Sequence, residues 1–310
     1  MKPHHFSYEQ AFDRNLGWLT AQEQAILRKS CVAIAGLGGA GGMQAQVLAR
    51  LGIGRFKIAD PDTFELTNIN RQIGASVETL GEQKTSVIRE MILSINPEAE
   101  VTIFEEGVTQ HNVDRFLESV DLALDGIDFF GQDSKLLFFR KCYEKRIPAL
   151  TSCPLGFGAS VIIFSPSGMK YEDYFDLQDQ MDEQKKRMAC TFGLSPSPLC
   201  LSYMDKEAFN LKTRRAASVS PAHMLVAAFS GTEAVKILTG KYRVRYAPHT
   251  YQIDLITQRV RRKYYPFGMR SPWQRIKKWF CQKLLNAQSH VPLQPKKPLE
   301  PEASVPASKP

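Results

Sequence analysis

The chain has 310 residues, 43% of them hydrophobic, and a net charge of +8; this is enough for one large α/β domain or two small ones. No run approaches the roughly 18 apolar residues of a transmembrane helix, and the first residues contain no apolar signal region. The six cysteines are scattered, which is typical of reduced thiols rather than of a disulfide framework. We therefore expect a cytoplasmic protein without a transmembrane segment.

The chain opens with a predicted helical segment over residues 1–30, after which apolar stretches alternate with helical patterns. This alternation is typical of βαβ units, which form a mostly parallel sheet. Strands are predicted at Val32–Gly36, Phe56–Asp60, Val101–Phe104, Leu122–Leu124 and Ala149–Thr151. We therefore expect an α/β fold with a Rossmann-like, doubly wound and mostly parallel sheet, helices on both of its faces and antiparallel additions on the C-terminal side.

A glycine-rich loop ends the first predicted strand. The stretch CVAIAGLGGAGG contains Gly36, Gly38, Gly39 and Gly41, and its spacing fits G-x-G-x-x-G. Glycine tolerates positive φ and lets ligand oxygens approach the backbone, and the amides of the helix that follows face an anion. The next strand ends at Asp60, about 20 residues later, where a carboxylate can meet ribose hydroxyls. These features fit a dinucleotide and ATP equally well.

The segment DPDTFELTNINRQIG, which begins at Asp60, separates these two ligands. A triphosphate needs more positive charge than a helix N-terminus supplies, and a guanidinium binds phosphate oxygens bidentately. Arg71 fits that role, and Lys84 begins the next predicted helix within reach of the same phosphates. Asp128 follows the fourth strand, where a carboxylate can hold Mg²⁺. The pattern favours ATP, although each side chain alone would also suit a solvated surface or a helix cap.

The pattern changes after Ser160. SVIIF predicts an antiparallel strand, YEDYFDLQDQMDEQKKRM a polar helical or irregular segment, and CTFGLSPSPLC, which begins at Cys190, a loop. PAHMLVAAFSGTEAVKIL then predicts an apolar helix and HTYQIDL a late strand. We expect one domain over residues 31–265, a basic amphipathic helix over residues 270–286 and a disordered Pro-rich tail over residues 287–310. The amphipathic helix either packs on its own domain or offers a weak contact for a membrane surface or a partner.

These motifs resemble the ThiF/MoeB/HesA family of ubiquitin-activating-enzyme-like adenylyltransferases. The resemblance covers roughly Arg14 to Leu255 and rests on GLGGAGG, NINRQ, GEQK, DGID and TEAVKILTG. It implies that ATP binds on the glycine loop, that a carboxylate attacks its α-phosphorus, and that pyrophosphate leaves behind an acyl-adenylate. Carried over, it assigns Asp60 to the ribose, Asn68, Arg71 and Lys84 to the phosphates, Gln72 to the nucleotide site and Asp128 to Mg²⁺. It also implies a homodimer in which Arg14 reaches the ATP site of the second subunit.

Three departures from the family pattern stand out. Phe129, Lys135 and Phe139 occupy places where members commonly carry Asn, Arg and Asn. No two cysteines are spaced as C-x-x-C, so we expect no zinc. Lys206–Arg215 looks like extra sequence in the region where such enzymes meet their acceptor protein, and the acceptor itself cannot be inferred.

Cys190 matches the place where some members carry the acyl group or form a persulfide link. Lys185, Lys186 and Arg187 lie just upstream and would lower the pKa of its thiol, and the predicted loop would let it move. The alternative is a small buried apolar residue. Cys200, farther along the predicted loop, competes for the same role.

We expect ATP-dependent adenylation of a carboxylate, namely the free C-terminus of a ubiquitin-like or sulfur-carrier protein, with release of pyrophosphate. Positioning and charge neutralisation by Arg71, Lys84 and Mg²⁺ suffice for such a displacement at phosphorus. Three alternatives stay open. One is a catalytically degenerate scaffold that binds a partner, which Phe129 and Phe139 would explain; the others are a tRNA threonylcarbamoyladenosine dehydratase-like enzyme and an NAD-dependent oxidoreductase.

Overall fold

The computed structural model describes residues 6–197, 199–205, 217–277 and 279. The chain divides into two compact units, Met1–Ser271 and Pro272–Pro310. In the second unit, residues 272–277 are helical, within the predicted amphipathic helix. The rest of that prediction falls largely outside the described residues, as do the predicted tail and the segment Lys206–Arg215.

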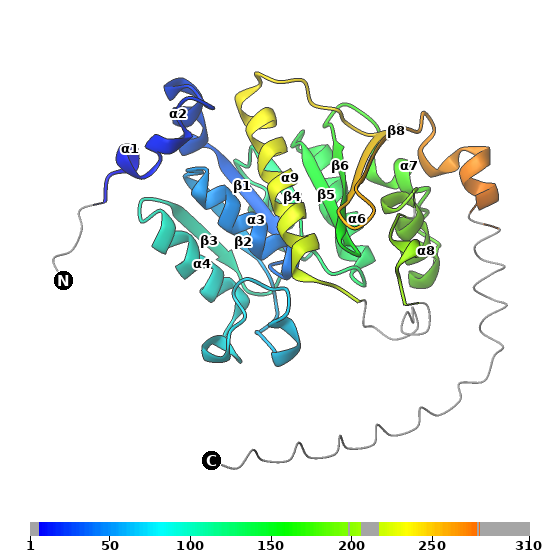
Figure 1. The fold of residues 1–310 in the computed structure, drawn as a ribbon, viewed down its shortest axis with the longest axis horizontal. Helices are drawn as coiled ribbons and strands as arrows, with labels where there is room; N and C mark the ends of the chain where they lie inside the picture. The colour runs from blue at the N-terminus through cyan, green and yellow to red at the C-terminus, as the bar shows by residue number, and fades with distance from the viewer. Residues whose placement is uncertain (1–5, 198, 206–216, 278, 280–310) are drawn as a thin grey trace, which may run out of the picture. The chain divides into compact units, whose positions relative to one another are not determined.

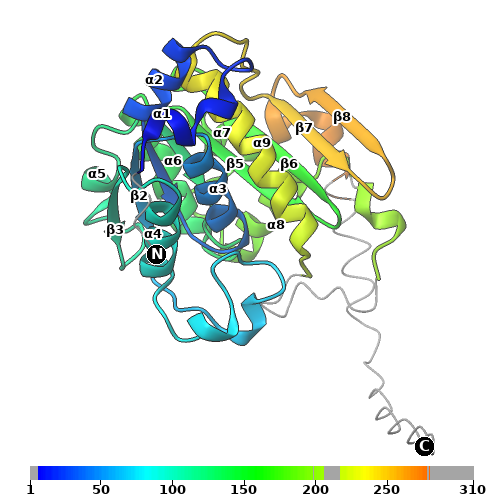
Figure 2. The ribbon, with the colours of Figure 1, turned by 60° about the vertical axis from the view of Figure 1, so that its left-hand side comes forward.

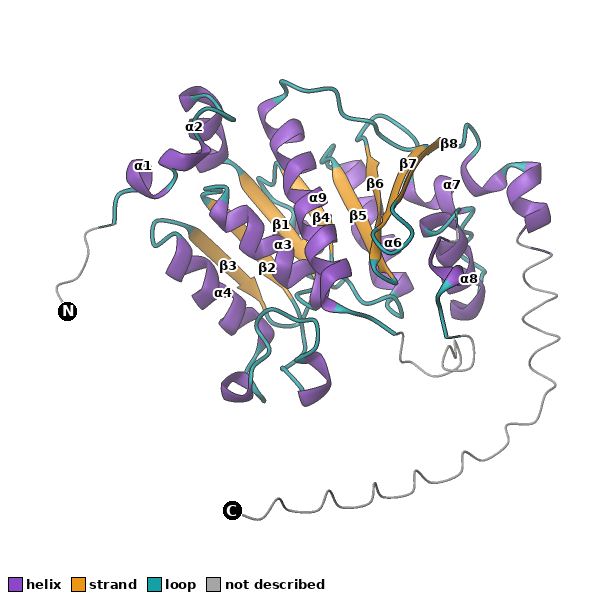
Figure 3. Cartoon of the chain, in the orientation of Figure 1, coloured by secondary structure: helices purple, strands orange, loops and turns teal. Residues whose placement is uncertain are grey.

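The first unit is built on an eight-stranded sheet (Figures 1 and 3). Its strands are β1 (Cys31–Ala35), β2 (Arg55–Ala59), β3 (Glu100–Phe104), β4 (Leu122–Asp125), β5 (Ala149–Leu155), β6 (Gly158–Phe164), β7 (His249–Asp254) and β8 (Arg259–Tyr264). They lie in the order β3-β2-β1-β4-β5-β6-β7-β8. The pairs among β1 to β5 are parallel, and β6, β7 and β8 are added antiparallel. The predicted doubly wound sheet with antiparallel additions is confirmed, and β8 is an additional strand that the pattern did not indicate.

Helices cover both faces of the sheet (Figure 2). One face carries α3 (Gly39–Arg50), α4 (Lys84–Ile95) and α9 (Ser220–Thr239), and the other carries α5 (Val113–Phe116), α6 (Gln132–Glu144), α7 (Tyr171–Phe175) and α8 (Glu183–Leu194). The central strand β1 reads CVAIA and is buried at every position. Such a continuous apolar strand is expected where both faces of a parallel sheet are covered.

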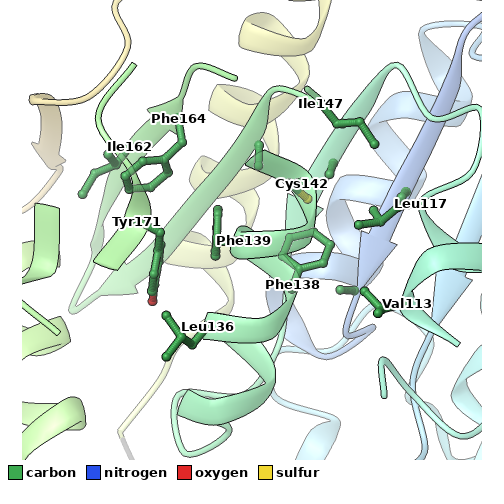
Figure 4. Packing of buried hydrophobic residues seen from close by; sticks show 14 of the residues in the cluster. Val113, Leu117, Leu136, Phe138, Phe139, Cys142, Ile147, Ile162, Phe164 and Tyr171 are labelled. Carbon is green, nitrogen blue, oxygen red and sulfur yellow. The ribbon is translucent and has the colours of Figure 1, made fainter. Parts of the chain in front are cut away.

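The core on the α6 side is rich in aromatic rings (Figure 4). Phe139 stacks on Tyr171, with ring centroids 4.1 Å apart and an interplanar angle of 8°. Phe164 packs against both of these rings. Phe139, which departs from the family pattern, is therefore part of a packed core.

The predicted loop at Cys190 is wrong, because α8 continues to Leu194. Ala189, Cys190, Gly193 and Leu194 form one buried stripe of that helix, and their i, i+1, i+4, i+5 spacing is helical. Of the Gly and Pro residues that favoured a loop in the sequence, Gly193 lies in the last turn of the helix and Pro196 follows it. Burial of the stripe against α6 and α7 overrides the low helix propensity of Gly193.

The N-terminal segment contains α1 (Tyr8–Ala11), the short 3₁₀ helix η1 (Asp13–Asn15) and α2 (Ala21–Lys29). The Tyr8 hydroxyl donates a hydrogen bond to the carbonyl of Gly52, and Gln24 Nε2 donates to the carbonyl of Leu51 at 3.0 Å. Both acceptors lie in the turn between α3 and β2. The segment is thereby held at the amino end of β2. The glycine loop follows the carboxyl end of β1, so the segment and the loop lie at opposite ends of the parallel strands.

Candidate nucleotide-binding site

The glycine loop lies at the carboxyl end of β1, where the strand order reverses: β2 and β3 lie on one side of β1, and β4 and β5 on the other. Gly36 has φ of +88°, and a Cβ on it would overlap the carbonyl oxygen of Gly126 in the loop after β4. A Cβ on Gly41 would in turn overlap the carbonyl oxygen of Gly36. Glycine is thus required for the two loops to meet. Open α/β sheets bind ligands in the crevice at this point.

The helix that follows the loop presents open backbone amides. α3 begins at Gly39 after the N-cap residue Gly38, and no side chain caps it. Its first amide groups have no partner within the helix and carry the positive end of the helix dipole. A phosphate group on this loop would therefore be bound by backbone N–H groups.

Asp60 anchors the glycine loop from the neighbouring strand end. Its Oδ2 accepts a hydrogen bond from Leu37 N at 2.6 Å, and its Oδ1 accepts one from Asp62 N at 2.9 Å. Burial raises the pKa of Asp60, while Lys84 and the two N–H groups oppose that rise. Because each carboxylate oxygen has a further lone pair, Asp60 retains acceptor capacity for a ribose hydroxyl.

Lys84 lies at the first position of α4 and is buried. Its Nζ is 3.0 Å from Asp62 Oδ2 and 3.8 Å from Asp60 Oδ1. The ammonium group of Lys84, which the sequence predicts to bind phosphates, is therefore held by two carboxylates next to the glycine loop. These contacts fix the position of the ammonium group and link the ends of β2 and α4.

The NINRQ segment borders the same loop. Gln72 is buried, its Oε1 has no hydrogen-bond partner among the described residues, and its Nε2 lies 3.7 Å from where a Cβ of Gly38 would stand. Arg71 is partly buried and donates through Nη1 to the carbonyl of Thr67 and to Asn70 Oδ1, both at 2.9 Å. Within the described part of the chain, its Nε and Nη2 have no partner, so one edge of the guanidinium is open to an anion. Asn68 has a local role, because its Oδ1 accepts from Glu65 N at 3.0 Å.

Asp128 is exposed in the turn after β4. One of its oxygens, Oδ1, accepts from Phe130 N at 2.7 Å. Among the described residues there is no group of three or more His, Cys, Asp and Glu side chains that could hold a metal. Mg²⁺ is commonly bound by one or two carboxylates together with substrate phosphates, and a single accessible carboxylate beside the glycine loop is compatible with such a site.

His223, in the first turn of α9, is a site residue that the sequence reasoning missed. A Cβ on Gly39 would overlap its imidazole ring, so the ring lies directly on the start of α3. Its Nε2 is 2.6 Å from Ser218 Oγ, and its buried Nδ1 has no partner among the described residues. Burial and the nearby Arg71 lower the pKa of His223 to about 4. The available signal was a histidine at the start of an otherwise apolar helix.

Two predicted site residues lie apart from this group. Arg14 is exposed on η1, in the segment held at the opposite edge of the sheet. Cys190 is buried on α8, with Sγ 3.0 Å from Gln132 Oε1 and 3.6 Å from the Tyr171 hydroxyl. Gln132 in turn donates to the carbonyl of Phe129, in the turn after Asp128. Cys190 therefore lies beneath that turn and contributes no surface to the site.

The structure thus brings together the glycine loop, Asp60, Lys84 and Gln72 by direct contacts, with Asp128 on the adjoining turn and Arg71 close to His223. Asn70 Nδ2 donates to the carbonyl of Ser218 at 2.9 Å, which ties the NINRQ segment to the start of α9. Among the residues that the structure describes, no helix combines the length and apolarity needed to cross a bilayer.

The chain is similar in sequence to curated proteins over about half of its length. The chain is 32% identical over 142 residues to a tRNA threonylcarbamoyladenosine dehydratase of Bacillus subtilis, covering 46% of this chain and 55% of that protein. It is 29% identical over 143 residues to the sulfur carrier protein ThiS adenylyltransferase of Escherichia coli, covering 46% of this chain and 56% of the relative. The chain thus spans about half the length of these curated relatives.

Solved structures share the fold. The structure of PaaA matches with a TM-score of 0.64 at 21% identity and covers 85% of each chain. E. coli MccB with ATP matches with a TM-score of 0.58 at 22% identity, covering 81% of this chain and 67% of MccB. A model of the ThiF family matches residues 12–268. This match spans nearly the whole first unit, and the chain therefore belongs to the ThiF family.

Proposed function

We propose that this chain transfers the adenylyl group of ATP to a carboxylate and releases pyrophosphate. The observation that carries the proposal is the convergence of three features at one point of the sheet. These are the uncapped start of α3, the open guanidinium edge of Arg71, and the exposed carboxylate of Asp128. Together they supply backbone donors, a cation and a metal ligand for a triphosphate.

The residues have separate roles in this reaction. Asp60 accepts hydrogen bonds from the ribose and holds the glycine loop through Leu37 N. Asn68, Arg71, Gln72 and Lys84 bind or border the phosphates. Mg²⁺ held by Asp128 would neutralise phosphate charge as pyrophosphate departs. The acceptor carboxylate supplies the nucleophile, so the protein needs to position the two reactants and to stabilise charge.

His223 fits the same site as a neutral hydrogen-bonding group. Its depressed pKa keeps the imidazole uncharged near neutral pH. With the Ser218 hydroxyl bonded to Nε2, Nδ1 is the ring atom left to serve the nucleotide side. We propose that it positions the start of α3 and donates or accepts one hydrogen bond there, according to its tautomer.

We propose that the acceptor is the C-terminal carboxylate of a ubiquitin-like or sulfur-carrier protein. The likeness to a ThiS adenylyltransferase supports this class. A second candidate is a tRNA-linked carboxylate, supported by the likeness to tRNA threonylcarbamoyladenosine dehydratases. Cys190 as a carrier of the acyl group would require α8 to move, because its thiol is buried.

We further propose a homodimer that works in the cytoplasm. Arg14 lies at the edge of the sheet away from its own glycine loop, so a part in catalysis requires a second subunit. The five described cysteines are all free thiols, as is common for proteins of a reducing compartment.

ATP–pyrophosphate exchange with candidate acceptors added one at a time tests the proposed function. Exchange that depends on one acceptor and on Mg²⁺ would support it and identify the acceptor. Tight binding of NAD without exchange would point to the oxidoreductase. Partner binding without exchange or ATP hydrolysis would point to a scaffold.

A further inference from the structure

A second cavity lies away from the nucleotide-binding site, between the C-terminal half of α9 and the strands β6, β7 and β8. It has a volume of about 170 Å³. Its apolar wall consists of Val161 and Ile163 of β6 together with Phe229 of α9 and Tyr251 of β7. The rings of Phe229 and Tyr251 pack 4.5 Å apart and are half-buried. The cavity therefore offers aromatic surface to a ligand.

Its rim is strongly basic. Arg243, Arg245 and Arg262 line it together with Lys236 and His249. Lys236 is neutralised by Glu233, with Nζ 2.7 Å from both carboxylate oxygens. In contrast, the three arginines are exposed and have no ion-pair or side-chain hydrogen-bond partner within the described part of the chain. Three uncompensated guanidinium groups thus surround one cavity.

The pKa of His249 is affected by these positive charges. Its ring contacts Tyr264, with centroids 4.7 Å apart. Burial lowers the pKa of His249, and Arg245, Arg243 and Arg262 lower it further. All three cations are therefore close enough to the same ring to act on it. An anion placed among them would oppose their effect.

The cavity is separate from the nucleotide-binding site. Both touch α9, but His223 of the nucleotide site lies in its first turn and Lys236 in its last. Lys236 lies thirteen positions after His223 on the helix, a distance of about 20 Å at the usual rise per residue. A ligand in the cavity would leave the glycine loop free.

We propose that this cavity, formed by Arg243, Arg245, Arg262, Phe229 and Tyr251, is a binding site for a nucleotide unit, that is, a phosphate group joined to a flat ring. A phosphate carries up to two negative charges and accepts paired hydrogen bonds from guanidinium forks, so it matches several arginines better than a single carboxylate does. The half-buried rings provide the stacking surface that bases use in single strands. The unit belongs either to a free nucleotide or to an RNA strand.

The register of β7 and β8 provides a matched control. Arg262 pairs with Tyr251, which lines the cavity, whereas Arg261 pairs with Gln252. Gln252 is buried on the other face, where its Oε1 accepts from Ser197 N at 3.0 Å. Because neighbouring side chains of a strand point to opposite faces, Arg261 does not reach the cavity. Arg262→Ala and Arg261→Ala remove the same charge from opposite faces.

The test measures binding of uridine 5′-monophosphate and of a single-stranded uridine oligonucleotide to the full chain by calorimetry and by NMR of His249, assigned with His249→Gln. We expect Arg262→Ala and Arg245→Ala to weaken binding at least tenfold, as for a charge-assisted contact, and Arg261→Ala to leave it within about twofold. The pKa of His249 should rise on binding. Tighter binding of the oligonucleotide identifies RNA as the source, and equal binding per unit identifies a free nucleotide.

Two results would overturn the proposal: equal affinity of Arg262→Ala and Arg261→Ala, or a pKa of His249 that neither probe changes. ATP–pyrophosphate exchange, measured on the same variants, should stay at the wild-type level. Failure of this inference is thereby distinguished from failure of the proposed adenylation.

Discussion

Lys135 Nζ lies 3.0 and 2.9 Å from the two carboxylate oxygens of Asp125, at the carboxyl end of β4. Both side chains are buried, and Thr151 Oγ1 of β5 donates to the same carboxylate at 2.7 Å. Asp125 lies directly before the turn that carries Asp128, and Lys135 lies after it on α6. Lys135, one of the departures from the family pattern, thus compensates a buried acid and fixes the end of β4.

We expect Lys135→Met to destabilise the protein by about 3–5 kcal/mol, because removing one partner leaves an uncompensated charge in the interior. Urea unfolding at neutral pH measures the change. Lys185→Met is the control: Lys185 pairs with Asp182 on the surface, with side chains 69% and 57% exposed, and such pairs contribute about 1 kcal/mol or less. A similar small loss for both variants would contradict the structural role of Lys135.

The depressed pKa of His223 predicts a pH-dependent stability. In the unfolded chain a histidine titrates near pH 6.5, whereas the folded protein holds His223 neutral down to about pH 4. Between these values the unfolded state binds more protons, so stability falls as the pH is lowered from about 6.5 to 4, by on the order of 3 kcal/mol in total. Urea midpoints across this range should decline more steeply in the wild type than in His223→Gln. Equal slopes would show that His223 titrates normally.

Local patterns predicted most of the sheet, because strands buried on both faces read as short apolar runs between glycine turns and helices. Cys31–Ala35 and Leu122–Asp125 are examples, and both strands were predicted within one residue. β8 escaped prediction because its residues are exposed and mostly charged. Such an edge strand is specified by pairing with β7 and not by burial.

Part of the candidate site could also be predicted from the sequence, and part could not. Asp60 and Gly36 follow strands, so their shared position could be predicted from the topology of parallel sheets. His223 comes from a helix nearly 200 residues beyond the glycine loop in the numbering, and its contact with Gly39 depends on how α9 packs against α3. Cys190 was wrongly predicted to lie in a loop. Burial of its helix face, which the local composition does not reveal, stabilises the helix there.

Arg71→Ala and Asp128→Ala should each lower the rate of ATP–pyrophosphate exchange by about 10²–10³, the usual cost of losing one contact to developing charge. Asp128 is exposed and Arg71 is only partly buried, so thermal unfolding should change little and separates lost chemistry from lost folding. Arg261→Ala, which removes the same charge as Arg71→Ala at a position away from the site, serves as a control. Unchanged exchange in both site variants would exclude the proposed site.

Mixed dimers test the position of Arg14. Arg14→Ala and Asp128→Ala proteins should each be inactive alone, whereas a mixture should recover part of the exchange activity, because one of the two composite sites in a mixed dimer has both residues. Recovery is expected to reach about a quarter of the wild-type rate at equal mixing, as half of the dimers are mixed and each has one intact site of two. If subunits demonstrably exchange and no activity returns, Arg14 acts within its own chain or not at all.

Cys190→Ser tests whether the buried thiol carries the acceptor. The hydroxyl can still donate to Gln132 Oε1, which lies 3.0 Å from Sγ, so the fold and pyrophosphate exchange should be retained. If Cys190 carries the acceptor, a thiol-sensitive conjugate on a non-reducing gel should disappear in Cys190→Ser and persist in Cys200→Ser. Because Cys190 is only 1% exposed, conjugate formation should also be slow, limited by movement of α8. A conjugate that persists in Cys190→Ser would eliminate this cysteine and leave an enzyme that passes its adenylate to a separate nucleophile.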